Sequence, residues 1–117
     1  SMGAMQATAV AALSGVVTQL RIDIPWMTDI NGASVGRDKG WLPEYNALKA
    51  KFDTVNMAKR ISCPVTIAAG LADEVCPPSG AAALYNQIHT PKSLTFYQAR
   101  GHADPLDEST PHYSLFA

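Results

Sequence analysis

Three residues of this sequence have side chains of the types that together perform nucleophilic acyl chemistry: Ser1, Asp73 and His102. A serine hydroxyl is a weak nucleophile until an imidazole removes its proton, and a carboxylate holds that imidazole in the required tautomer. Taken singly, each has an ordinary explanation, because an Asp in a Gly/Pro-rich segment usually forms a turn and Ser1 could be a serine without a role. Their order along the chain, Ser then Asp then His, makes them candidates for one catalytic triad.

The elements that must position these residues alternate between strands and helices. Apolar, β-branched runs bounded by Gly or Pro predict strands, and Ala- or Leu-rich runs predict helices. The predicted strands are 16–24, 63–70 and 93–99, and the predicted helices are 3–14, 52–61 and 80–88. This alternation predicts βαβ units in a parallel α/β sheet, in which the working residues follow the carboxyl ends of the strands. Asp73 and His102 lie in the two loops, 71–78 and 100–108, that take this position.

The sequence also predicts the structure of two further segments and the N-cap residues of two helices. Residues 26–50 contain three glycines, a proline and both tryptophans, and we expect an excursion with one short helix. The final residues, 112–117, are expected to form the first turn of a helix. Asp53 or Thr54 is a candidate N-cap for the helix over 52–61, and Ser79 for the helix over 80–88.

The composition bounds the classes of function. A hydrophobic content of 47% with 16% charged residues is that of a globular chain, and 117 residues allow one domain at most. A net charge of −1 does not indicate binding to nucleic acid or to an anionic membrane. No apolar run is long enough to span a bilayer. Cys63 and Cys76 flank a predicted strand about 20 Å long, too far apart for a disulfide, so we expect free thiols. No zinc or redox spacing is present, and no cofactor is expected.

Several stretches of the chain carry a family resemblance. They are "SMGAMQATAVAAL" with "RIDIPWMTDI", then "FDTVNMAKRI", "CPV", "GLADEVCPP", "YN" and "GH". Together they resemble the acetyl xylan esterase/cephalosporin-C deacetylase family of α/β hydrolases, from Ser1 to about His102. The stretch "GLADEVCPP" is the most specific of these motifs.

The resemblance implies a serine carboxylesterase that removes acetyl groups from carbohydrate esters, so the partner is an acetylated saccharide or a small acyl ester. It implies Ser1 as nucleophile, Asp73 as acid, His102 as base and the Met2 backbone N–H as an oxyanion donor. The excursion over 26–50 would then place Trp26, Trp41 and Tyr45 toward the substrate. The alternative for these three aromatic residues is that they pack a small satellite core.

The family fold has strands before the nucleophile that do not occur among these residues. We therefore expect residues 1–117 to form the C-terminal part of a single α/β-hydrolase domain, with about three strands and weak activity or none. The strand over 16–24 would leave an open edge, which favours a homo-oligomer, most simply a dimer through this edge or the helix over 3–14. The alternatives are a non-catalytic, self-associating hydrolase fragment, or another activity on the same fold, such as a peptidase or an acyltransferase.

Overall fold

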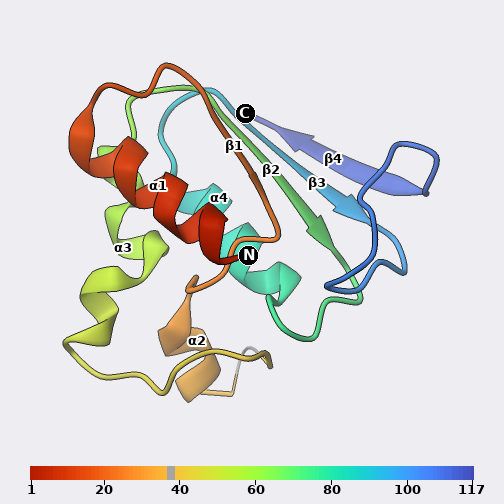
Figure 1. Cartoon of the computed structure of the whole chain (residues 1–117), viewed down its shortest axis with the longest axis horizontal. Coiled ribbons are helices and arrows are strands. Elements are labelled where there is room, and N and C mark those ends of the chain that lie inside the picture. The colour runs from red at the N-terminus through yellow and green to blue at the C-terminus, as the bar shows by residue number, and fades with distance from the viewer. Residues whose placement is uncertain (37–38) are drawn as a thin grey trace.

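A four-stranded sheet runs through the molecule (Figure 1). The computed structural model describes residues 1–36 and 39–117. Strands β1 (Leu20–Asp23), β2 (Val65–Gly70) and β3 (Lys92–Tyr97) are parallel, whereas β4 (His112–Phe116) runs antiparallel to β3. The sheet order β1-β2-β3-β4 follows the chain. The three parallel strands and the helices between them confirm the predicted α/β class.

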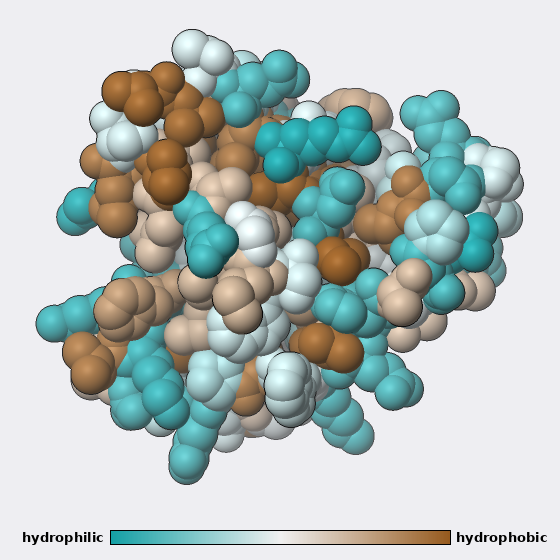
Figure 2. All heavy atoms as spheres, in the orientation of Figure 1, coloured by the Kyte–Doolittle hydropathy of each residue, from teal (hydrophilic) through white to brown (hydrophobic). Residues whose placement is uncertain are grey.

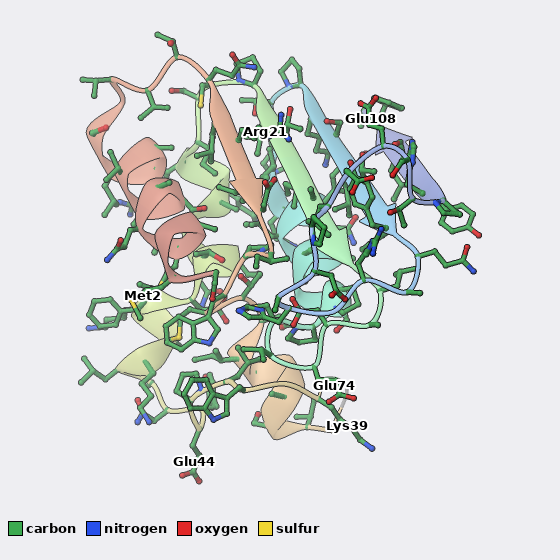
Figure 3. The ribbon with its side chains drawn as sticks, turned by 45° about the vertical axis from the view of Figure 1, so that its right-hand side comes forward. Met2, Arg21, Lys39, Glu44, Glu74 and Glu108 are labelled. Atoms are coloured by element: carbon green, nitrogen blue, oxygen red, sulfur yellow. The ribbon has the colours of Figure 1, made fainter. Side chains whose placement is uncertain are left out.

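The main helices lie on one face of this sheet. Helices α1 (Met2–Ser14), α3 (Thr54–Met57) and α4 (Pro78–Gln87) pack with the sheet into one buried apolar cluster. The sheet contributes Leu20, Ile22, Val65, Ile67, Ala69 and Leu94 to this cluster. The alternate side chains of the strands are mostly polar, and they include Arg21, which Figure 3 labels on β1. The core therefore sits between one sheet face and the helices.

Local signals placed several element boundaries correctly. Helix α1 ends where Gly15 adopts a left-handed conformation with φ 67°, which glycine adopts without steric cost. Asp53 is the N-cap of α3, and its side chain accepts a hydrogen bond from the Val55 N–H. The predicted helix over 52–61 continues past α3 only as a 3-10 turn, η2 (Ala58–Arg60).

Other boundaries differ from the prediction. Ser79 does not cap α4; the helix begins one residue earlier, at Pro78, because a proline at N1 needs no N–H partner. The strand predicted over 16–24 covers only Leu20–Asp23, since its pairing starts where the Leu20 N–H meets the Pro64 carbonyl. The excursion over 26–50 contains α2 (Ile30–Ser34) and the start of a 3-10 turn, η1 (Lys49–Phe52), rather than one short helix. Residues 37 and 38 of this excursion lie outside the described part.

The helical turn expected at the C-terminal end of the chain is wrong. Residues 112–116 form β4, which pairs with β3 from Ser93↔Phe116 to Tyr97↔His112. A helix of six residues pays the full cost of nucleation, whereas the outer edge of β3 offers backbone partners. Aromatic residues such as Tyr113 and Phe116 also favour strands. The sheet therefore has four strands instead of three.

Two further expectations concern the cysteines and membranes. Cys63 and Cys76 are both free, as predicted, and both are buried. Within the described residues, no helix has the length and apolar character needed to cross a membrane.

Exposed apolar side chains gather near the C-terminal end of α1, where Figure 2 shows a hydrophobic patch that includes Val10, Leu13 and Val16.

Candidate active site

The loop after β2 fixes the carboxylate of Asp73. The backbone N–H groups of Val75 and Cys76 both donate to Asp73 Oδ1, at 2.8 Å each. The Asp73 side chain is completely shielded from solvent. A buried carboxylate is costly unless its lone pairs are satisfied, and here the turn of the loop itself supplies the donors. The carboxylate is thus held in one orientation by its own loop.

The loop after β3 crosses the end of β2 at very short range. The Arg100 carbonyl accepts a hydrogen bond from the Ala72 N–H at 3.0 Å, and Leu71 N–H bonds the Tyr97 carbonyl at 2.9 Å. A Cβ atom on Gly70 would collide with the Arg100 carbonyl oxygen. Glycine at position 70 therefore allows the two loops to join, and this brings His102 over Asp73.

His102 and Asp73 form a hydrogen-bonded pair. His102 Nδ1 lies 3.0 Å from Asp73 Oδ2 and 3.2 Å from Oδ1. The histidine side chain is 31% exposed and faces a cavity of about 500 Å³. The carboxylate thus holds Nδ1 and leaves Nε2 free for a reacting group. This is the arrangement that a general base needs in acyl transfer.

Ser1 lies on the same cavity as His102, and its hydroxyl faces a different partner. It is the N-cap residue of α1, and it lines the cavity together with Met2, Trp26, Trp41, Val75 and His102. Ser1 Oγ lies 3.7 Å from Cys76 Sγ, and among the described residues it makes no hydrogen bond to His102. The first N–H groups of a helix have no partner inside the helix. Ser1 gives α1 no side-chain cap, and among the described residues no hydrogen bond from the Met2 N–H is found.

Cys76 is a residue of this site that sequence reasoning missed. The sequence raised it only as half of a possible disulfide, although its place three residues after Asp73 in the same loop is a usable signal. The thiol is almost fully buried. Burial raises the pKa of the Cys76 thiol, and the charge of Asp73 adds to this effect, whereas the hydrogen bond with Ser1 opposes it. The thiol is therefore kept protonated beside the serine hydroxyl.

The three aromatic residues of the excursion separate into two groups. Trp26 and Trp41 line the cavity, and the Trp26 indole N–H donates to the Trp41 carbonyl at 2.8 Å. The backbone N–H of Trp41 in turn donates to the Val75 carbonyl at 2.9 Å, so this wall is attached to the loop of Asp73. Tyr45 is not among the lining residues. Exposed fractions of 78% for Trp41 and 42% for Tyr45 do not fit a satellite core.

The segment that carries Trp26 is held by a second buried carboxylate. Ile24, Met27 and Asp29 all have positive φ, which is strained for residues other than glycine. Asp53 accepts hydrogen bonds from the Asp29 and Ile30 N–H groups at 2.9 and 2.8 Å. Burial raises the pKa of Asp53 although these hydrogen bonds lower it. Asp53 thus keeps the segment in a conformation that its backbone alone would not favour.

Three charged residues lie on the same side of the molecule as Met2. Figure 3 shows Met2 at the first turn of α1, on the side of the molecule that also carries Lys39, Glu44 and Glu74. The charged ends of these last three side chains point outward. The cavity itself is lined mainly by apolar and aromatic side chains, with the hydroxyl of Ser1 and the imidazole of His102 as its polar groups.

Known proteins resemble this chain in both sequence and fold. Residues 44–112, more than half of the chain, match the acetyl xylan esterase (AXE1) family. The acetyl esterase Axe7A of Xylanibacter ruminicola is 35% identical over 103 residues, which cover 79% of this chain and 23% of that protein. The chain thus spans about a quarter of this curated relative.

Solved structures give the same result. An acetyl xylan esterase from Paenibacillus sp. R4 superimposes with a TM-score of 0.76 at 27% identity, covering 90% of this chain and 39% of that one. Acetyl xylan esterase 1 from Thermoanaerobacterium sp. JW/SL YS485 gives 0.73 at 28% identity, over 93% and 40%. A puromycin-hydrolysing peptidase of Mycobacterium tuberculosis, at 18% identity and a TM-score of 0.71, shares the fold. With its family match running through the loops that hold Asp73 and His102, the chain belongs to the acetyl xylan esterase family.

Proposed function

We propose that this site removes acetyl groups from acetylated carbohydrates, with Ser1 as nucleophile, His102 as general base and Asp73 as the carboxylate that orients it. The observation that carries the proposal is the His102–Asp73 pair, which opens onto the same cavity as Ser1. Membership of the acetyl xylan esterase family supports the substrate class. The proposal requires a rotation of the Ser1 side chain, away from Cys76 and toward His102 Nε2.

In the first half of the reaction, Ser1 Oγ attacks the carbonyl carbon of the acetyl ester while His102 Nε2 takes the hydroxyl proton. The oxyanion that forms is stabilised by the Met2 N–H and by the positive end of the α1 dipole. Collapse of the tetrahedral intermediate breaks the ester bond. His102 returns the proton to the departing sugar hydroxyl, and the acetyl group remains on Ser1 Oγ.

In the second half, water replaces the sugar. His102 Nε2 removes a proton from the water, whose oxygen attacks the acetyl carbon, and the proton then returns to Ser1 Oγ as acetate leaves. Asp73 accepts the His102 Nδ1–H throughout and so holds the imidazole in one tautomer. Trp26 and Trp41 form the wall against which the acetyl group and its sugar would lie.

Covalent labelling with a fluorophosphonate tests the nucleophile without needing full turnover. Serine attack on phosphorus displaces fluoride and leaves a phosphonylated residue that mass spectrometry can locate. We expect the label on Ser1, its loss in His102→Gln, and its retention in Ser109→Ala, a serine of the adjoining loop that lies outside the cavity lining. Labelling of Ser1 at the same rate in His102→Gln would contradict the proposal.

We propose further that residues 1–117 are part of one α/β-hydrolase domain. The chain spans about two-fifths of the solved acetyl xylan esterases it superimposes on. Without further oxyanion donors and pocket walls the chain should turn over aryl acetates slowly, because one missing donor alone costs about 10²- to 10³-fold. Fast acetate release by the 117-residue chain, abolished in Ser1→Ala, would contradict this expectation while supporting the nucleophile.

We also propose that the chain self-associates. β1 lies at one end of the sheet order, where no strand of the described residues pairs with its outer edge, and the neighbouring α1 exposes Val10 and Leu13. Open strand edges and contiguous apolar surfaces favour association. Sedimentation at low micromolar concentration should show a dimer, which Leu13→Glu should weaken. A stable monomer of the unmodified chain would contradict this proposal.

A further inference from the structure

Three potential metal ligands meet beside the cavity, and one of them, His102, lines it. A carboxylate oxygen of Asp73, the Sγ atom of Cys76 and a ring nitrogen of His102 all lie within 4.8 Å of one another. Asp73 and Cys76 are buried, and His102 is partly exposed. The esterase mechanism uses the first and the last of these groups, but it leaves the thiol without a task.

The donor set suits a thiophilic divalent cation. One thiolate, one imidazole and one carboxylate are all ligands of Zn²⁺, and sites with three protein ligands leave a fourth position open. Among the described residues, Asp73 Oδ2 accepts a hydrogen bond only from His102, so one of its lone pairs remains available. Ser1 Oγ lies 3.7 Å from Cys76 Sγ, so this hydroxyl or a water molecule is close to the fourth position.

The cation can reach the cluster, and the cluster needs little adjustment. Metal–ligand bonds of 2.0–2.3 Å place the donor atoms of a tetrahedral site roughly 3.3–3.8 Å apart. The present separations of up to 4.8 Å therefore require side-chain movements of about 1 Å. The cavity of about 500 Å³, lined by Ser1, Val75 and His102, provides the path from solvent.

We propose that Asp73, Cys76 and His102 form a binding site for Zn²⁺ or a related thiophilic cation, and that the bound cation blocks the active site. On binding, the Cys76 thiol releases its proton to solvent and Sγ bonds the metal, while His102 coordinates as a neutral imidazole. The same imidazole can then no longer hold its hydrogen bond to Asp73 and receive the proton of Ser1. Binding stands independently of the esterase proposal, whereas inhibition rests on it.

Cadmium binding tests the site without any assay of activity. Cd²⁺ bonded to a thiolate gives a charge-transfer absorption in the ultraviolet, so the reduced, metal-free 117-residue chain is titrated with Cd²⁺. We expect one such band per chain, its loss in Cys76→Ala, and its retention in Cys63→Ala, since Cys63 lies before β2 and Cys76 lies after it. His102→Gln should weaken Cd²⁺ binding at least about tenfold, because even partners outside the ligand shell contribute 10- to 100-fold.

A competition experiment separates this proposal from the esterase proposal. Zn²⁺ should slow fluorophosphonate labelling of Ser1 in the unmodified chain and in Cys63→Ala, but not in Cys76→Ser, which is used if Cys76→Ala does not fold. A cadmium band without any Ser1 labelling would leave the metal site standing and overturn the esterase. Labelling of Ser1 without a cadmium band, or a band that persists when Cys76 is replaced, overturns the metal site.

Discussion

Two buried aspartates serve two regions of this molecule in different ways. Asp73, in the loop after β2, receives two backbone N–H groups on Oδ1, and among the described residues only His102 bonds Oδ2. Asp53, at the start of α3, accepts hydrogen bonds from backbone N–H groups on both oxygens. The N–H groups of Asp29 and Val55 donate to Oδ1, and that of Ile30 donates to Oδ2. Both side chains are nearly inaccessible to solvent. A carboxylate that keeps one oxygen for an imidazole can do chemistry, whereas one saturated by N–H donors holds structure.

The largest expected effect follows from breaking the Asp73 side of this comparison. In Asp73→Asn, the amide can no longer hold His102 in the tautomer that accepts a proton from serine. We expect the rate of Ser1 phosphonylation to fall by about 10⁴-fold, the size of loss seen when a triad carboxylate becomes an amide. Timed labelling followed by mass spectrometry measures this rate. A loss below tenfold would mean that Asp73 has no part in activating Ser1.

A second variant separates Asp73 from His102 without altering either side chain. Gly70→Ala places a Cβ against the Arg100 carbonyl, which must move and carry the start of the histidine loop with it. We expect labelling of Ser1 to slow by about 10- to 100-fold, since small misplacements of catalytic groups have effects of this size. Gly3→Ala is the matched control, because a Cβ at Gly3 meets nothing within 4 Å. Equal rates in the two variants would contradict the role given to Gly70.

Substitution of Asp53 should lower the stability of the fold and leave the reaction of Ser1 nearly unchanged. Asp53→Asn keeps one oxygen but turns an amide NH₂ toward a backbone N–H such as that of Ile30. An unsatisfied buried donor costs about 1–3 kcal/mol of unfolding free energy, which urea denaturation can measure. Under native conditions, labelling of Ser1 per folded molecule should change less than threefold, roughly 0.6 kcal/mol in activation free energy. A labelling loss as large as that of Asp73→Asn would remove the distinction between the two aspartates.

The smallest effect concerns the pH dependence of stability. Burial raises the pKa of Asp53 above its ordinary value of 3.8, so the folded chain binds this proton more tightly than the unfolded chain. The stability that protonation of Asp53 contributes is therefore complete below pH 3.8 and is lost as the pH rises through the folded-state pKa. Urea unfolding at several pH values should show that the difference in unfolding free energy between the unmodified chain and Asp53→Asn shrinks as the pH rises through this window. A constant difference would contradict the raised pKa.

Local patterns predicted the parts of the fold that depend on neighbouring residues. Gly15 ended α1 because a left-handed residue suits glycine, and the apolar run before Gly70 gave β2. The same reasoning placed Asp73 and His102 after neighbouring strands, and the structure shows them hydrogen-bonded. Parallel strands end at one edge of the sheet, so strand ends that are distant in sequence still converge there.

Other features depend on partners far along the chain, which local patterns do not reveal. Residues 112–117 were expected to be helical, but the free edge of β3 decided their conformation. Asp53 was recognised as a candidate cap, yet its hold on Asp29 and Ile30 spans more than twenty residues. The contact between Cys76 Sγ and Ser1 Oγ spans 75 residues and leaves no mark in spacing. These contacts follow from the assembled fold.

The hydrogen bond between the two tryptophans has a practical consequence for spectroscopy. The chain has two tryptophans, Trp26 and Trp41, and both lie on the wall of the candidate site. Their indole fluorescence therefore reports on this cavity and its immediate surroundings. Because the Trp41 N–H bonds the Val75 carbonyl, a shift of the Asp73 loop should alter the emission directly. The protein thus contains its own optical probe, and ligand entry can be followed without an attached dye.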